Sequence, residues 1–183
     1  VNWSGEHWIS YLRRPDAARN GGMVSLYNMR YTEAGHGVVA FVVIEGDGGD
    51  GFKGLCTTHR DVADFVVNKV TQHVRHPPYD EELPVIDATF TQGGHAARDP
   101  EWTISAEDHE IVAKWSRIQP VVIAAGPWPG DSNSNYVHTL LHFADESLIE
   151  LDGHVIDGKP YIRDIWHESI GGDRSSCLFA ISE

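Results

Sequence analysis

Two histidines and an aspartate in the last third of the chain have residue types and spacing suited to proton transfer. His138 and His142 lie in an apolar, strand-like segment, and their even spacing places both side chains on one face. Asp164 lies in a second strand-like segment, two residues before Trp166. A carboxylate among apolar side chains has a raised pKa, and it can orient an imidazole or move a proton. We therefore predict Asp164, His138 and His142 as a catalytic acid–base group.

Asp164 joins this group only in one register of the preceding hairpin. Asp-Gly between two strand-like runs is a strong hairpin signal, so we expect a two-residue turn at Asp157-Gly158. This turn pairs Leu151 with Asp164. It also sets Asp152 opposite Arg163, an oppositely charged pair that supports the register. The acid then lies on an otherwise apolar face.

The histidines reach the same face through a second predicted turn, at Asp145-Glu146. With two or four residues in this loop, Leu140 lies opposite Leu151 and His142 shares the face of the acid. A three-residue loop would turn all of these side chains to the opposite face. The ligand-binding wall that follows from this register consists of Tyr136, Leu140, Leu151 and Trp166.

This group predicts a cofactor-independent lyase or isomerase that acts on a small, largely apolar molecule. The chain has no serine-hydrolase elbow, no phosphate-binding loop and no Cys-x-x-Cys motif. Its Gly-x-Gly-x-x-Gly at 46–51 opens no helix and contains two aspartates, which would repel a dinucleotide. Binding of an apolar ligand without chemistry and a purely structural polar cluster are the alternatives from the same residues.

A metal site is a further interpretation of the residues in the same strand. His138, His142, Glu146 and Gly153 resemble the first cupin motif, in which two histidines precede a glutamate and, six residues later, a glycine. The resemblance implies a metal-dependent enzyme as a second alternative. Three residues rather than one separate the histidines here, which puts them about 13 Å apart on a strand. Because one ion could hardly bind both, we predict no metal.

The elements that must position these residues are mostly strands. The hydrophobic pattern predicts a helix over 58–74, with an apolar stripe, and a short helix over 4–18. A hairpin is predicted from 23–32 and 36–45, joined by a link that contains glycine. The remaining predicted strands are 83–92, 110–118, 121–125, 136–143, 148–155, 161–166 and 176–181.

Many short strands with an inserted amphipathic helix predict a mainly β, single domain over residues 1–183, an antiparallel barrel or strongly curved sheet. Gly5-Glu6-His7-Trp8 resembles the Gly-x-Trp that opens lipocalins, which implies a barrel that carries an apolar ligand. A helix after the first two strands is similar to the cone of the NTF2-like fold, which implies an α+β alternative. A lipocalin-like carrier is accordingly the first alternative function.

The amino-acid composition restricts the binding partners that we expect. The 183 residues carry 14 basic and 27 acidic side chains, a net charge of −13, which argues against nucleic acid and anionic membranes. No apolar run reaches the length of a membrane span, and we identify no signal peptide within the given chain. We therefore expect a cytoplasmic protein that binds a small molecule and could form a homodimer, although a start at Val1 leaves processing or secretion open. Cys56 and Cys177 could pair or stay free.

Overall fold

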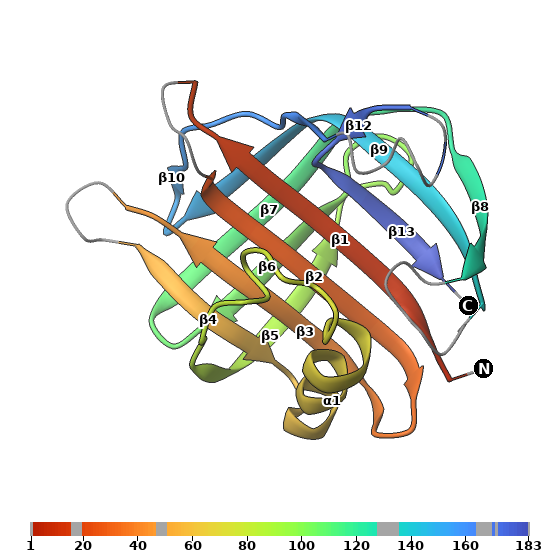
Figure 1. Ribbon diagram of the computed structural model, residues 1–183. Coiled ribbons are helices and arrows are strands. Elements are labelled where there is room, and N and C mark those ends of the chain that lie inside the picture. The colour runs from red at the N-terminus through yellow and green to blue at the C-terminus, as the bar shows by residue number, and fades with distance from the viewer. Residues whose placement is uncertain are drawn as a thin grey trace.

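The computed structural model describes residues 2–15, 20–46, 51–127, 136–163, 170 and 172–182. Most of them belong to one large sheet that curves until it closes on itself (Figure 1). The strands of this sheet are β1 (Trp3–Arg13), β2 (Asn20–Thr32), β3 (Gly35–Ile44), β4 (Phe52–Thr57), β5 (Val85–Gly93), β6 (Glu101–Ala106), β7 (His109–Ile118), β8 (Val122–Pro127), β9 (Tyr136–Leu151), β10 (His154–Val155) and β13 (Leu178–Ser182). A separate small pair joins β11 (Ile162–Arg163) to β12 (Arg174–Ser175).

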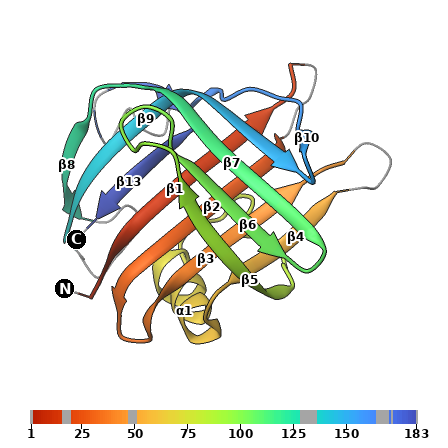
Figure 2. The ribbon, with the colours of Figure 1, turned by 180° about the vertical axis from the view of Figure 1, so that it is seen from behind.

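Hydrogen bonds run round the sheet in the order β9, β13, β1, β2, β3, β4, β5, β6, β7, and β7 pairs with β9 to complete the ring. Figure 2 shows the closing side, where β5, β6 and β7 lie in front. β4 and β5 run parallel, because a helical crossover connects them. The prediction of a mainly β chain with a strongly curved, lipocalin-like sheet is confirmed.

The inside of the ring is a packed aromatic and aliphatic core. Side chains alternate along each strand, so Trp8 of β1 points inward together with Trp115 of β7 and Phe179 of β13. The indole Nε1 of Trp115 donates a hydrogen bond to the carbonyl of Ile9, 2.7 Å away on β1. Because the three aromatic side chains are at most 2% exposed, they fill much of the interior.

The predicted helix covers part of the outer face of the sheet. α1 (Arg60–Phe65) continues into a π-helical turn, η1 (Val66–Val70), and packs on β3 and β4 (Figure 1). The helix is therefore confirmed, and it is shorter than the predicted 58–74. Within the described ranges, no helix is long and apolar enough to cross a membrane. The stripe that the helix buries consists of Val62, Phe65, Val66 and Val70.

The N-terminal segment is a strand rather than the short helix expected over 4–18. In β1, Trp8 and Leu12 face the interior of the ring, whereas Ile9 and Tyr11 pack on its outer face. With both faces buried, the segment lacks the alternation that marks a half-exposed strand. The helix prediction was wrong for this reason.

β9 runs without interruption through Asp145 and Glu146, where the sequence predicts a turn. These two acids stay inside the sheet because β7 pairs with β9 on both sides of them, from Leu151 back to Ala144. Leu140 and Leu151 therefore belong to one strand and cannot face each other. That part of the predicted register was wrong.

The tight turn is at Asp152-Gly153, not at the predicted Asp157-Gly158. Both turn residues have positive φ, 52° and 76°, as a type I′ hairpin requires. β10 pairs back onto the end of β9 directly after the turn. The carboxylate of Asp152 accepts a hydrogen bond from the backbone N–H of Glu110, so the predicted pairing of Asp152 with Arg163 was also wrong.

Cys56 and Cys177 are buried free thiols. Burial raises the pKa of the Cys56 thiol to about 12, and burial also raises the pKa of Cys177. Both thiols are consequently protonated and shielded at neutral pH. They are packing residues of the fold.

Candidate functional site

Four of the predicted site residues share one face at the beginning of β9: Tyr136, His138, Leu140 and His142. The ring of His142 stacks on Phe179, an interior residue, with centroids 4.6 Å apart, whereas Tyr136, His138 and Leu140 are exposed. Burial lowers the pKa of His142. The ring of His138 contacts that of Tyr136 instead, at 5.3 Å. The two histidines thus lie on a common face but contact different aromatic rings.

The other three predicted residues do not join them in the described chain. Leu151 is buried in the interior core at the far end of β9. Leu151 lies eleven positions after Leu140, which corresponds to about 35 Å of chain along the strand. Asp164 and Trp166 lie outside the described residues. The catalytic group built on Asp164 therefore stays a prediction.

The cupin-like set does not gather around a common point. Glu146 accepts a hydrogen bond from the Ser116 hydroxyl and forms an ion pair with Arg117. Gly153 is part of the tight turn after β9. Across the ranges that the structure describes, no three His, Cys, Asp or Glu side chains are placed to hold a metal ion.

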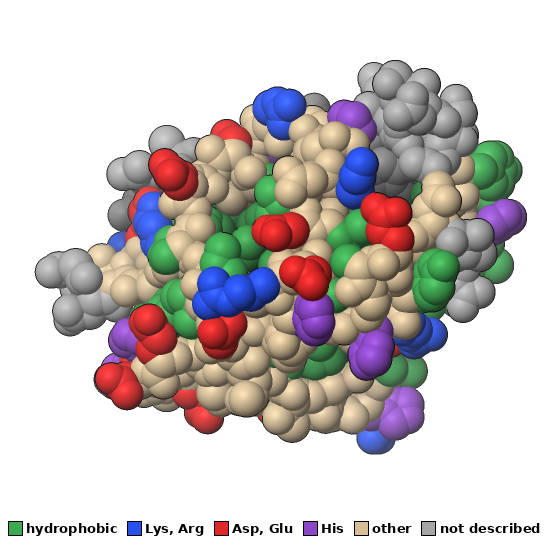
Figure 3. All heavy atoms as spheres, turned by 90° about the horizontal axis from the view of Figure 1, so that it is seen from below, with side chains coloured by type: hydrophobic (Ala, Val, Ile, Leu, Met, Phe, Trp, Pro, Cys, Tyr) green, Lys and Arg blue, Asp and Glu red, His purple; other side chains and the backbone are tan. Residues whose placement is uncertain are grey.

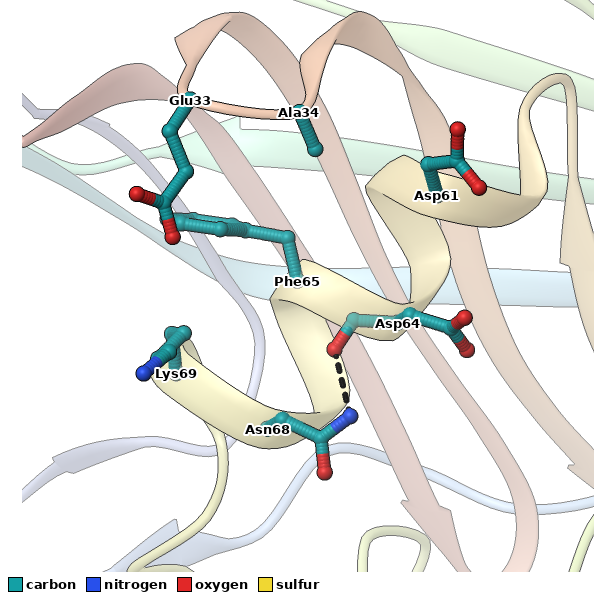
Figure 4. A pocket seen from close by; sticks show the side chains of 7 residues that line it. All are labelled: Glu33, Ala34, Asp61, Asp64, Phe65, Asn68 and Lys69. Atoms are coloured by element: carbon teal, nitrogen blue, oxygen red, sulfur yellow. Dashed lines mark hydrogen bonds between the residues drawn. The ribbon is translucent and has the colours of Figure 1, made fainter.

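A hollow of about 350 Å³ beside the helix is also a poor candidate (Figure 4). Asp61 and Asp64 project from the helix away from Glu33, so their carboxylates do not converge. The amide of Asn68 donates a hydrogen bond to the backbone carbonyl of Asp64, and it is therefore engaged by the helix itself. Seen from below, the surface of the described residues has acidic, basic and histidine side chains interspersed, without a large patch of one charge (Figure 3).

A larger pocket, of about 540 Å³, lies on the outer face of the sheet. It is found where β1 and β3 end and β2 and β4 begin, toward the upper left in Figure 1. The sheet contributes Tyr11, Arg13 and Met23 to its lining, the segment after the helix contributes His76, and the segment before β11 contributes Tyr161. We call this the outer pocket. Its volume is within the range of about 300–1,000 Å³ that is typical of small-molecule sites.

A chain of hydrogen bonds leads from the outer pocket toward the middle of the sheet. The hydroxyl of Tyr11 donates to that of Tyr79 at 3.1 Å, and the Tyr79 hydroxyl lies 2.6 Å from Oγ of Ser25. Oγ of Ser25 in turn lies 2.8 Å from Nε2 of His7, whose ring stacks on Tyr27 at 3.9 Å. We call Tyr11, Tyr79, Ser25 and His7 the hydroxyl chain. Tyr79 comes from the segment between η1 and β5, so this segment crosses β1 and β2.

Burial keeps both ends of the hydroxyl chain uncharged at neutral pH. It raises the pKa of Tyr11 well above the ordinary value, and the neighbouring Tyr79 raises it further. Burial also lowers the pKa of His7 to about 3, with a smaller lowering by the nearby Arg163 guanidinium. Tyr11 is therefore a phenol that can donate a proton. His7 is a neutral imidazole that resists a second proton.

His76 places an imidazole ring in the wall of the outer pocket. Its Nδ1 lies 2.9 Å from the carbonyl of Pro77, and since a carbonyl only accepts, Nδ1 carries the proton of the neutral ring. Nε2 is then the nitrogen with a lone pair. The ring packs edge-on against Tyr79, with centroids 5.6 Å apart, so this acceptor lies next to the hydroxyl chain.

Sequence reasoning missed this site because its members come from three separate segments. With residues 4–18 interpreted as a helix, His7 and Tyr11 could not be paired with β2. In the observed register His7 faces Tyr27, and Ile9 faces Ser25. The available signal was that His7 and Ser25 are polar residues inside otherwise apolar segments, where a buried polar group needs a partner.

No protein-family model, no curated protein and no solved structure matches this chain. What the site can do follows from its own geometry. The outer pocket combines a protonated phenol, an imidazole whose Nε2 faces no described hydrogen-bond partner, and guanidinium groups. These groups suffice for a proton transfer in which negative charge develops on a substrate oxygen.

Proposed function

We propose that this chain is an enzyme, an isomerase or a lyase, that binds a small, largely apolar molecule in the outer pocket. Its own side chains act as acid and base. The observation that carries the proposal is the hydroxyl chain, which ends at a pocket-lining phenol, Tyr11, that burial keeps protonated. The reaction class is the one predicted from the sequence, but the proposed site is on the opposite face of the sheet.

Tyr11 is the proposed hydrogen-bond donor to a carbonyl oxygen of the substrate, and its single hydroxyl proton turns from the Tyr79 oxygen to this carbonyl oxygen when the substrate binds. Negative charge grows on that oxygen when a proton leaves the neighbouring carbon, and a fixed donor stabilises this charge. The guanidinium of Arg163 lies 5.6 Å from the centre of the Tyr11 ring, so its positive charge adds to the stabilisation. The ring of Tyr11 stays in place during this turn because it is buried in the sheet.

His76 is the proposed base. Its Nε2 takes the proton from the carbon beside the substrate carbonyl, because Nδ1 already carries the ring's proton. Return of the proton at another carbon gives an isomer, and loss of a leaving group gives a lyase product. His76 replaces the His138 or His142 of the sequence prediction, and Tyr11 replaces Asp164.

Incorporation of solvent deuterium tests this proposal without knowledge of the full reaction. A panel of small carbonyl compounds is incubated with the protein in D₂O, and exchange at the carbon beside the carbonyl is followed by NMR. We expect exchange with the wild type. Tyr11→Phe should lower its rate by about 10²- to 10⁴-fold, the usual contribution of a positioned acid or base.

Tyr31→Phe is the matched control, because Tyr31 is an exposed tyrosine of β2 outside both the outer pocket and the hydroxyl chain. It should exchange at the wild-type rate. Equal rates in Tyr11→Phe and the wild type would contradict the role of Tyr11. A set of compounds that bind in the pocket without any exchange would instead favour the carrier alternative.

A further inference from the structure

Two guanidinium groups in the outer pocket have no carboxylate partner among the described residues. They belong to Arg13 and Arg163. The other long cation of the pocket, Lys53, forms an ion pair with Glu81 at 2.9 Å. The pocket therefore offers two guanidinium groups that form no ion pair with a described carboxylate.

Both guanidinium groups are held by tyrosine rings instead. Arg13 Cζ lies 3.9 Å from the centre of the Tyr161 ring, and Arg163 Cζ lies 5.6 Å from the centre of the Tyr11 ring. Each pair thus joins β1 to the segment 161–163 in a crossed arrangement. A guanidinium stacked on a ring keeps its N–H edges free, and these edges fit the two oxygens of a carboxylate.

The backbone fixes this arrangement from both sides. Arg13 exchanges two backbone hydrogen bonds with Lys159, both at 3.0 Å. Arg163 pairs with Arg174 in the small β11–β12 sheet, and the backbone N–H of Tyr161 donates to Oγ of Ser176. The two cations are therefore preorganised, which lowers the entropic cost of binding an anion.

The other side chains that line the pocket determine which kind of body a bound anion can have. Tyr11, Tyr161, Met23 and Pro77 present aromatic and apolar surface. Glu45 and Glu81 also line the pocket, so its three cations and two acids leave one net positive charge, which favours a singly charged anion over a phosphate ester. We propose that the substrate of the outer pocket is a small monocarboxylate with an aromatic or unsaturated apolar body, whose carboxylate Arg163 and Arg13 bind. This inference rests on the proposed function, because it names the substrate class of the same site.

Calorimetric titration with paired probes tests the inference. The probes are benzoate, cinnamate and phenylpyruvate, each beside its neutral amide, with inorganic phosphate as a further anion. We expect at least one carboxylate to bind, its amide to bind at least tenfold more weakly, and phosphate not to compete. Arg163→Met should weaken the carboxylate by about ten- to a hundredfold, the range for a hydrogen-bonded charged group. It should leave the amide unchanged.

Arg98→Met is the matched control for loss of one positive charge, because Arg98 is exposed in the turn before β6, outside the pocket. It should bind the carboxylate as the wild type does. Equal affinity for carboxylate and amide, or failure of every carboxylate to bind, overturns the inference. Carboxylate binding that depends on Arg163 while Tyr11→Phe leaves deuterium exchange unchanged removes the catalysis and keeps the substrate class. Deuterium exchange that occurs only on neutral compounds would keep the proposed catalysis and overturn the carboxylate substrate class.

Discussion

Acidification from pH 7 to pH 5 is expected to destabilise this protein by about 2 kcal/mol through one side chain, His7. Burial among the outer-face side chains, helped by Arg163, lowers the pKa of His7 to about 3 in the folded state. In the unfolded chain the same group has a pKa of about 6.5. Below pH 6.5 the unfolded state therefore binds a proton that the folded state does not, and stability falls as the pH is lowered.

Between pH 7 and pH 5, the loss of stability is determined by the protonation of His7 in the unfolded state. At pH 5, a group with a pKa of 6.5 is protonated about thirtyfold more often than not, which favours unfolding by about 2 kcal/mol. Because pH 5 lies well above the native pKa, the folded state contributes almost nothing to this difference. At pH 3 the loss reaches about 4 kcal/mol, and it levels off at about 5 kcal/mol below the native pKa.

Urea unfolding followed by tryptophan fluorescence, at pH values from 5 to 8, measures this effect. Other groups also titrate, so the comparison is between the wild type and His7→Gln, with His36→Gln at an exposed position as the control. His7→Gln should be less stable than the wild type at pH 7, because it loses the stacking on Tyr27. The gap should shrink by about 2 kcal/mol at pH 5. A gap that stays constant with pH would refute the buried, neutral His7.

Three further predictions concern the fold. Trp115→Phe leaves the Ile9 carbonyl without its 2.7 Å donor inside the ring, so we expect urea unfolding at pH 7 to show a loss of about 1–2 kcal/mol; an unchanged midpoint would contradict the interior packing. Gly153→Ala should cost about 1 kcal/mol in the same assay through backbone strain alone, since φ is +76° and no atom crowds the added Cβ; a neutral result would place the turn elsewhere. Cys56 and Cys177 should resist Ellman's reagent in the native protein and react once urea unfolds it, whereas rapid native reaction would contradict their burial.

The sequence predicted the fold wherever one buried face leaves a periodic pattern. The helix over 60–70 has such a pattern and is present. The hairpin of β2 and β3 is also present, but its strands are buried on both faces, and it was predicted from its apolar runs and the glycine-containing link between them. β1 has apolar side chains on both faces, and this hides the period of two that marks a strand. Two Asp-Gly pairs lie within seven residues, and local sequence does not decide between Asp152-Gly153 and Asp157-Gly158, because both satisfy the same turn chemistry.

The site was harder to predict than the fold because it depends on long-range register. The face shared by His138 and His142 follows from strand geometry alone, and the structure has it. The hydroxyl chain instead joins His7 to Ser25, 18 residues away, and Ser25 to Tyr79, 54 residues away. No local pattern contains that information.

The location of a bound ligand tests the central claim most directly. A crystal structure of the protein with the tightest-binding compound from the carboxylate panel would provide it. We predict electron density in the outer pocket, between Tyr11 and His76, with the carboxylate on the guanidinium of Arg163. A ligand found inside the ring, against His142 and Phe179, would contradict this account and return the chemistry to the residues that the sequence alone singled out.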